Sequence, residues 1–299
     1  MYRLNEIFFF EMVNKKIYRG KKEKIVKYSL FIFAFSSIMI LLLIVIFLFR
    51  EGYPIFVKMG VKEFLFGEKW KPKKDVYGAL PFIVTSVIVT FGALSFAIPL
   101  GIASAIMLSE IAGSEVKALL RPLIELLAGI PSIVYGFFGL MLIANIVQRS
   151  FDLPTGECLF TGSLILGVMA LPLIISISQD AMESVPKEYR EASLALGATE
   201  WQTISKIVIP CAFRGILASV ILAMGRAIGE TMAVVLVLGN VEKLPTSIFD
   251  PAEALTSAIL LEMAEAVVGS THYQALFGLG IILFFITLFL RLVSEKIMR

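Results

Sequence analysis

The chain has 299 residues, of which 58% are apolar and 17% are charged, with a formal net charge of +3 and a mean hydropathy of +0.87. A soluble domain carries about 25% charged residues, so this composition excludes an ordinary soluble globular protein. The small net charge argues against a nucleic-acid-binding protein, and two cysteines with one histidine offer neither a disulfide framework nor a metal cluster.

Six apolar stretches are long enough to cross the roughly 30 Å hydrocarbon core of a bilayer at 1.5 Å per helical residue. The first, 29–49, follows 28 residues rich in lysine and arginine and is predicted to be an anchor that is not removed. The sequence therefore predicts an all-α integral membrane protein, with a basic N-terminal segment at 1–28 and a six-span membrane domain at 29–299. The later spans are expected at 80–108, 119–147, 160–178, 212–239 and 274–290.

The distribution of basic residues predicts the orientation of the spans, because short cytoplasmic loops carry an excess of lysine and arginine. Eight basic residues precede the first span, and the later loops alternate between more and fewer, which predicts that both termini are cytoplasmic. The loop at 50–77 is the exception, since it carries seven basic residues. An apolar patch at Ile7–Phe10 is expected either to lie on the anionic inner leaflet or to belong to a disordered basic tail.

A shorter apolar stretch at 254–261 is predicted to be an interfacial or re-entrant helix. Asp250 before it is a candidate N-cap, with a proline in the first turn and Glu253 at the third helical position. The single histidine, His272, follows this stretch and is expected in a solvated loop.

The loop at 184–210 is predicted to fold as a helix, a glycine turn and a second helix. Ser184 is a candidate N-cap for the first helix, which is expected to stop at Gly197, since glycine is favoured just after a helix C-terminus. Residues 199–202 have the spacing of a capping box for the second helix, which is expected to end at Pro210. Such a unit could insert as a rigid knob into a soluble partner. On the residues alone, a hairpin that merely links two spans is the alternative.

Two charged residues lie near the middle of the predicted fifth span. Arg226 stands about 21 Å along the helix from Ala212 at 1.5 Å per residue. An arginine at that depth costs about 2.5–3.5 kcal/mol on insertion scales, so it is expected to face a cavity or a partner. Glu230 follows one turn later on the same helix face. Two interpretations stay open: the side chains pair for packing alone, or Arg226 binds an oxyanion and Glu230 competes with it, so that the anion can leave.

The loop at 184–210 also carries a spaced pattern. Residues 191–193 read Glu-Ala-Ser, Gly197 follows after three residues, and 207–210 read Ile-Val-Ile-Pro after nine more. This pattern resembles the EAA loop of binding-protein-dependent ABC importers, which docks in a groove of the ATPase subunit. The resemblance implies an ATPase-coupling role for the residues that match the pattern: Glu191, Ala192, Ser193, Gly197, Ile207 and Pro210.

Two further segments resemble the phosphate-specific ABC permeases. Residues 225–233 read Gly-Arg-Ala-Ile-Gly-Glu-Thr-Met-Ala, and residues 127–139 read Leu-Ala-Gly-Ile-Pro-Ser-Ile-Val-Tyr-Gly-Phe-Phe-Gly. The first segment is closer to the C-type than to the A-type subunit of that family. The resemblance implies a fold like that of the type I ABC importer permeases and places Arg226 and Glu230 on the substrate path. It further implies an A-type second permease subunit, an ATPase dimer and an extracytoplasmic phosphate-binding protein as partners.

These features predict a multi-pass inner-membrane permease subunit of an ATP-driven importer for inorganic phosphate, in contact with lipid and with no nucleic-acid partner. The sequence has no Walker A pattern. ATP and magnesium are therefore expected on the partner ATPase, and no cofactor, metal or catalytic residue is expected on this chain. A permease for another oxyanion, sulfate or molybdate, is the alternative, because one arginine does not distinguish these anions by charge. An intramembrane enzyme is disfavoured because no histidine lies in any predicted span.

Overall fold

The computed structural model describes two units of the chain, residues 1–50 and 51–299, and each is treated by itself. The backbone is described for residues 2–298. Side chains are described for residues 23, 26–293, 295 and 296.

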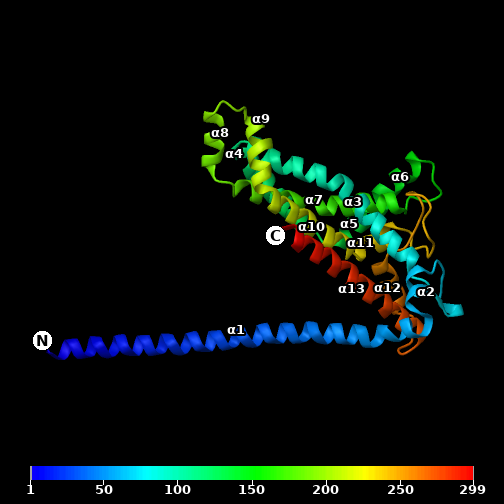
Figure 1. The fold of residues 1–299 in the computed structure, drawn as a ribbon, viewed down its shortest axis with the longest axis horizontal. Coiled ribbons are helices and arrows are strands. Elements are labelled where there is room, and N and C mark those ends of the chain that lie inside the picture. Colours follow the sequence, from blue (N-terminus) through cyan, green and yellow to red (C-terminus); the bar gives the residue numbers. More distant parts are fainter. Residues whose placement is uncertain (1, 299) are drawn as a thin grey trace. The chain divides into compact units, whose positions relative to one another are not determined.

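A single long helix, α1 (Tyr2–Met59), runs through the first unit and ends in the second (Figure 1). Its part Val26–Met59 is long and apolar enough to cross a membrane and contains the predicted span 29–49. The large apolar side chains of residues 30–44 are mostly exposed on this chain, as suits a helix that faces lipid or a partner. The predicted apolar patch at Ile7–Phe10 lies outside the described side chains.

The second unit is mostly helical, and its described sheet has only two antiparallel strands, β1 (Trp70–Lys71) and β2 (Val76–Tyr77). A 3₁₀ turn, η1 (Pro72–Lys74), connects them. The α-helices are α2 (Val61–Phe66), α3 (Leu80–Ile106), α4 (Ser114–Gly129), α5 (Ser132–Phe138), α6 (Asn145–Ser150), α7 (Leu159–Glu183), α8 (Lys187–Ala195), α9 (Glu200–Thr203), α10 (Ile209–Ile228), α11 (Met232–Val237), α12 (Leu255–Met263) and α13 (Thr271–Met298). Three π-helical turns are η2 (Met107–Ile111), η3 (Gly139–Ala144) and η4 (Ile204–Val208).

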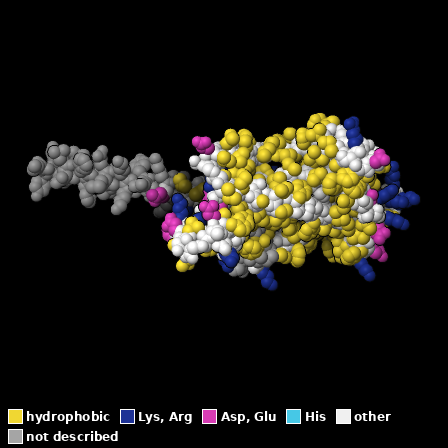
Figure 2. Space-filling view, turned by 90° about the horizontal axis from the view of Figure 1, so that it is seen from above, with side chains coloured by type: hydrophobic (Ala, Val, Ile, Leu, Met, Phe, Trp, Pro, Cys, Tyr) yellow, Lys and Arg dark blue, Asp and Glu magenta, His cyan; other side chains and the backbone are white. Residues whose placement is uncertain are grey.

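Six segments are long and apolar enough to cross a membrane, which confirms the predicted six-span helical fold. Figure 2 shows hydrophobic side chains over the middle of the second unit and charged side chains mostly at its two ends, as a membrane requires. The six segments are Val26–Met59, Leu80–Ile111, Ser132–Ser150, Leu159–Glu183, Glu200–Ile228 and Thr271–Val293.

The predicted third span, 119–147, is not one helix. Helix α4 ends at Gly129, Ile130 is extended, and α5 starts at Ser132. Pro131 causes this break, because it lacks a backbone N–H and disfavours the helical conformation of the residue before it. None of the residues of α4 is buried, and the membrane-length segment starts only after the break.

The predicted fifth span, 212–239, is shifted and broken. The membrane-length segment begins at Glu200 and passes Pro210 without ending. The π-helical turn η4 makes this possible: the Ile209 N–H bonds to the Ile204 carbonyl, five residues back, so that Pro210 falls in the first turn of α10. The segment then stops at Ile228, and the next helix, α11, starts four residues later.

The segment before α12 differs from its prediction. Asp250 is not a helix cap; it accepts hydrogen bonds from Thr246 and Ser247 at 2.8–2.9 Å and so closes a turn in the preceding loop. Helix α12 begins only at Leu255, and Glu253 is buried ahead of it instead of standing in its first turn. His272 lies in the first turn of α13 with a side chain only 19% exposed, so the prediction of a solvated loop is wrong.

Helix α7 lies at the centre of the second unit and packs against α3, α4 and α10. A buried hydrogen bond of 2.9 Å between the Ser178 and Ser219 hydroxyls joins α7 to α10. Figure 1 shows α8 and α9 at one end of the unit and α2 and α12 at the other. The long helices therefore connect two ends, each of which carries its own group of polar residues.

Candidate functional site

The α8–α9 unit has the helix, turn and helix that the sequence predicts. Gly197 has φ +83°, a conformation that disfavours every residue with a Cβ, and a Cβ there would meet nothing within 4 Å. The capping box forms: the Thr199 hydroxyl accepts from the Gln202 N–H at 3.2 Å, and the Gln202 amide oxygen accepts from the Thr199 N–H at 2.9 Å. Ser184 does not cap α8, because its hydroxyl donates to the Ala181 carbonyl at 2.7 Å.

The residues of the EAA-like pattern divide between the inside and the outside of this unit. The buried Ser193 hydroxyl bonds the buried Thr203 hydroxyl at 2.9 Å and holds α8 against α9. Glu191 and Ala192 are exposed, as is Pro210, and Ile207 is half-buried. The unit thus combines a rigid interior with a surface available to a partner.

Two large apolar side chains stand out on the surface of the unit. Leu196 is 89% exposed and Trp201 is 62% exposed. Exposed tryptophan and leucine at the tip of a rigid hairpin are suited to a protein interface, where aromatic residues are enriched. This surface favours the knob over the plain connecting hairpin.

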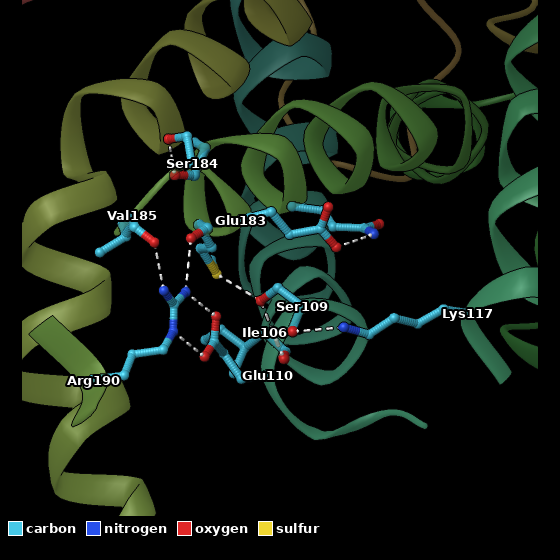
Figure 3. A network of polar contacts seen from close by, with 11 residues as sticks. Ile106, Ser109, Glu110, Lys117, Glu183, Ser184, Val185 and Arg190 are labelled. Atoms are coloured by element: carbon cyan, nitrogen blue, oxygen red, sulfur yellow. Dashed lines mark hydrogen bonds and ion pairs between the residues drawn. The ribbon is translucent and has the colours of Figure 1, made fainter. Parts of the chain in front are cut away.

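An ion pair holds the base of α8 (Figure 3). Arg190 donates to both carboxylate oxygens of Glu110, at 2.8 and 3.1 Å, and Glu110 is only 8% exposed. The same guanidinium donates to the carbonyls of Met182 and Val185, at 2.9 and 2.6 Å. One side chain therefore joins α8 to the end of η2 and to the end of α7.

Further polar contacts hold α4 against η2 and α7. Lys117 donates to the Ser109 carbonyl at 2.8 Å. Arg121 pairs with Asp180 at 3.2 Å and with Glu125 at 3.3 Å, on a more exposed surface. These contacts connect α4 to η2 and α7, the same two elements that Arg190 joins to α8.

Sequence reasoning missed both Glu110 and Arg190. Their separation of 80 residues hides the pair in a single sequence. The one available signal is the position of Glu110 just past the predicted span 80–108, where an unpaired carboxylate would be costly to bury.

The second candidate site lies where the fifth membrane segment breaks. Arg226 is exposed in the last turn of α10, while Glu230 lies in the connection to α11. The Glu230 carboxylate accepts from the Ala233 N–H at 3.3 Å, so it caps α11. Among the described residues no ion pair joins Arg226 to Glu230; the expected pair on one helix face is wrong because the helix stops at Ile228.

Arg226 and Glu230 still border the same small recess, together with Met169 and Ala170 of α7. Arg226 also faces a larger hollow of about 620 Å³ between α10 and α13, where Arg291 lies. Arg226 thus lines two hollows, and its guanidinium forms no ion pair with a carboxylate of the described residues.

The two interrupted segments, α5 and α11, pack directly on each other. A Cβ at Gly136 would lie 2.8 Å from the Ala233 Cα, which only glycine permits. Tyr135, beside it, donates to the Leu127 carbonyl at 2.8 Å across the Pro131 break, and lies close enough to Arg226 to interact electrostatically. The segments 127–139 and 225–233, far apart in sequence, therefore build one site.

The fold and the two sites define an integral membrane transport subunit. Residues 97–299 match the family of binding-protein-dependent transport system inner membrane components, and the chain belongs to that family. It is a multi-pass inner-membrane protein and a transport component, not an enzyme.

Relatives of known sequence make the class more specific. The chain is 45% identical over 261 residues to the probable ABC transporter permease protein YqgH of Bacillus subtilis, covering 85% of this chain and 84% of that protein. It is 38% identical over 256 residues to the phosphate transport system permease protein PstC of Mesorhizobium japonicum, covering 79% and 78%. It is 33% identical over 292 residues to PstC of Haemophilus influenzae, covering 91% and 92%. The chain is thus an ABC importer permease subunit similar to PstC.

Solved structures support the fold. An inward-facing form of the MetNI methionine ABC transporter matches with a TM-score of 0.59 at 17% identity, over 74% of this chain and 96% of that chain. A bacterial alginate ABC transporter in complex with a periplasmic protein matches with a TM-score of 0.57 at 16% identity, over 89% and 94%. Identities this low support the shared architecture alone.

Proposed function

We propose that this chain is a permease subunit that imports inorganic phosphate and that Arg226 contacts the anion during its passage. The observation that carries the proposal is the exposed, uncommitted Arg226 guanidinium within a membrane-length segment. An arginine at membrane depth is stable only where it faces a partner or a water-filled path. Its planar donor fork suits the oxygens of a phosphate.

Glu230 has a different role from the one its spacing predicts. It caps α11 and, through its carbonyl, accepts the Thr256 hydroxyl of α12 at 2.7 Å. We assign it to hold the break beside Arg226 and to keep its negative charge near the path, so that the anion is bound weakly enough to leave.

The partners follow from the same proposal. The exposed surface around Glu191, Leu196 and Trp201 docks a separate ATPase, which binds ATP and magnesium. A second permease subunit covers the exposed face around Arg226, and an extracytoplasmic binding protein delivers the anion. Both termini lie in the cytoplasm.

The choice between phosphate and another oxyanion rests on the relatives called PstC, since the printed name of the more similar YqgH gives no substrate. Uptake of radiolabelled phosphate by proteoliposomes that contain the whole transporter tests this choice. ATP-dependent uptake that excess sulfate and molybdate leave unchanged supports phosphate. Uptake that sulfate or molybdate suppresses at equal concentration overturns it in favour of a broader oxyanion permease.

A matched pair of variants tests the role of Arg226. Hydrogen bonds to a charged group contribute about 1.5–3 kcal/mol, so Arg226→Gln is expected to lower phosphate uptake by roughly 10- to 100-fold. Arg291→Gln removes another arginine that lines the same 620 Å³ hollow and is expected to keep wild-type uptake. Equal uptake by the two variants, with normal assembly of the complex, would remove Arg226 from the substrate path.

A further inference from the structure

Three glutamates converge at the end of the second unit opposite α8. Glu242 lies in the loop after α11, Glu253 lies just before α12, and Glu262 lies on α12. Each offers a carboxylate oxygen, and these three oxygens all lie within 4.8 Å of one another. Neither the transport path at Arg226 nor the α8 surface uses them.

Glu253 is the residue that demands an explanation. Its side chain is only 3% exposed, and no hydrogen bond or ion pair reaches its carboxylate from any described residue. The backbone around it is fixed, because the Ala252 N–H bonds the Leu238 carbonyl at 2.9 Å and the Leu255 N–H bonds the Ser86 hydroxyl at 3.0 Å. The fold therefore holds an unpartnered carboxylate against two others.

Three like-charged groups this close disfavour their charged forms. Burial, together with the charges of Glu262 and Glu242, raises the pKa of Glu253 to about 8. Basic residues are near, since Lys71, Lys73 and Lys74 line the adjoining cavity of about 630 Å³. Within the described part of the chain, however, none of these lysines forms an ion pair with the three glutamates.

Hydrogen bonds from two neighbouring side chains orient the carboxylate of Glu262. The buried Trp70 donates its indole N–H to both oxygens of Glu262, at 2.8 and 3.0 Å. His272 Nε2 bonds the Oε2 of Glu262, and the His272 ring stacks on Tyr77. Carboxylates that bind metal ions are held in this way by hydrogen bonds from surrounding side chains.

We propose that Glu242, Glu253 and Glu262 bind one hard divalent cation, such as Ca²⁺ or Mg²⁺. Carboxylate oxygens are the ligands that these ions prefer. Three oxygens that all lie within 4.8 Å of one another lie within about 2.8 Å of a common point. Ca²⁺ binds oxygen at about 2.3–2.6 Å, so small side-chain adjustments bring all three carboxylates onto a single ion. Water from the adjoining cavity completes the coordination. The sequence predicts no metal site because it offers no cluster of histidine and cysteine. The three carboxylates proposed here come from separate segments and follow no local spacing pattern.

Such an ion would link the end of the molecule to the break at Arg226. Glu253 lies just before α12 and Glu262 lies in its last turn, and Thr256 of the same helix donates to the Glu230 carbonyl at 2.7 Å. A bound cation fixes α12 between these points and thereby fixes the connection between α10 and α11. This proposal is independent of the anion transported.

Terbium luminescence tests the site on the purified transporter in lipid nanodiscs. Tb³⁺ replaces Ca²⁺ at oxygen sites and emits strongly only when an excited aromatic side chain, tryptophan or tyrosine, lies beside it. The chain has two tryptophans, so a Trp201→Phe background leaves Trp70, in contact with Glu262, as its single tryptophan. Excitation at the long-wavelength edge of the tryptophan band, where tyrosine does not absorb, then makes Trp70 the chain's sensitiser. We expect saturable emission that excess Ca²⁺ displaces.

Two matched variants locate the ion. Glu253→Gln keeps the shape of the side chain and is expected to weaken Tb³⁺ binding at least tenfold. Glu265→Gln removes an exposed carboxylate on the same cavity, outside the three, and is expected to bind as the wild type does. Melting temperatures measured with and without Ca²⁺ distinguish a lost site from a misfolded variant. Ca²⁺ is expected to raise the melting temperature of the wild type and of Glu265→Gln, but not that of Glu253→Gln. Absence of displaceable emission, or equal affinity in the two variants, overturns the proposal and leaves shared protons as the way these carboxylates are neutralised.

Discussion

At the scale of single residues, Gly197 and Gly113 show that a glycine can matter through conformation alone. A Cβ at either position would meet nothing within 4 Å. Only Gly197 has a positive φ, +83°, whereas Gly113 has φ −67° and ψ 163°, which any residue adopts. The difference between the two is therefore purely one of backbone energy.

This difference predicts the outcome of a matched substitution. A residue with a Cβ in the left-handed region costs roughly 1–2 kcal/mol, and a β-branched side chain is especially disfavoured there. Gly197→Val is therefore expected to distort the α8–α9 turn, weaken co-purification of the ATPase and reduce coupled uptake. Gly113→Val is the control and is expected to leave both unchanged. Equal behaviour of the two variants in ATPase co-purification would contradict the role of the turn.

The Gly197 turn and the capping box at 199–202 were predictable, because both depend on residues within a few positions of each other. The roles of Arg226 and Glu230 were only partly predictable. Their spacing predicts a pair on one helix face. In the structure α10 instead ends before Gly229, and the Glu230 carboxylate caps α11. Glu253 was misplaced for a similar reason, since Asp250 closes a loop and is not free to cap α12.

At the scale of helices, the Arg190–Glu110 pair fixes α8 to the end of η2. Glu110→Gln leaves Arg190 with one neutral acceptor oxygen at position 110 and the two backbone carbonyls, and removes the negative charge of a largely buried pair. Loss of a charged hydrogen bond costs about 1.5–3 kcal/mol. We therefore expect the variant to retain ATP hydrolysis in the assembled transporter while losing most of its phosphate uptake.

A more exposed pair provides the control for this experiment. Glu125 pairs with Arg121, and their side chains are 62% and 50% exposed. Exposed pairs contribute about 0–1 kcal/mol, so Glu125→Gln is expected to stay coupled. If hydrolysis and uptake fall together in Glu110→Gln, the pair stabilises the subunit and does not transmit motion.

The close packing of α5 on α11 gives a further prediction. Gly136→Ala would place a methyl group 2.8 Å from the Ala233 Cα and 2.9 Å from a Leu236 methyl. Overpacking of this kind costs about 1–3 kcal/mol, so the melting temperature of the purified subunit is expected to fall. Gly129→Ala, where a Cβ meets nothing within 4 Å, is expected to leave it unchanged or slightly higher. A similar melting temperature in both variants would show that the two helices separate freely.

The helix breaks mark the limit of hydropathy as a guide to these elements. Apolar content continues through Ile130–Pro131 and Gly229–Thr231, so hydropathy predicts continuous spans over both. The backbone nevertheless breaks there, at a proline in the first case and at a capped glycine turn in the second. These sites needed the tertiary structure, because each broken segment is stabilised by packing on the other.

At the scale of the whole molecule, the number of spans was predictable because lipid demands about 20 apolar residues for each crossing. The pairing of segments was not. Contacts such as Glu110 with Arg190, or Trp70 with Glu262, join residues 80 and 192 positions apart. No local pattern in one sequence encodes those distances.

The orientation of the molecule leads to a prediction about two lysines. Lys73 is exposed in the turn of the β-hairpin that precedes α3. Lys187 is exposed at the start of α8, near the opposite end of α3. Helix α3 is about 40 Å long at 1.5 Å per residue, which exceeds the roughly 30 Å hydrocarbon core. The two positions must therefore lie on opposite sides of the membrane, and the excess of basic residues before the first span predicts that Lys187 is inside.

Labelling of single cysteines with a membrane-impermeant maleimide checks this topology. The exposed native Cys211 is first replaced by serine, while the buried Cys158 can stay. In intact cells we expect Lys73→Cys to react and Lys187→Cys to react only after permeabilisation, which also shows that the second site is chemically competent. The reverse pattern would invert the orientation and place α8 where no cytoplasmic ATPase can reach it. Reaction of both positions in intact cells would contradict the assignment of α3 as a span, because an intact bilayer of that thickness cannot separate two residues that the same external reagent reaches.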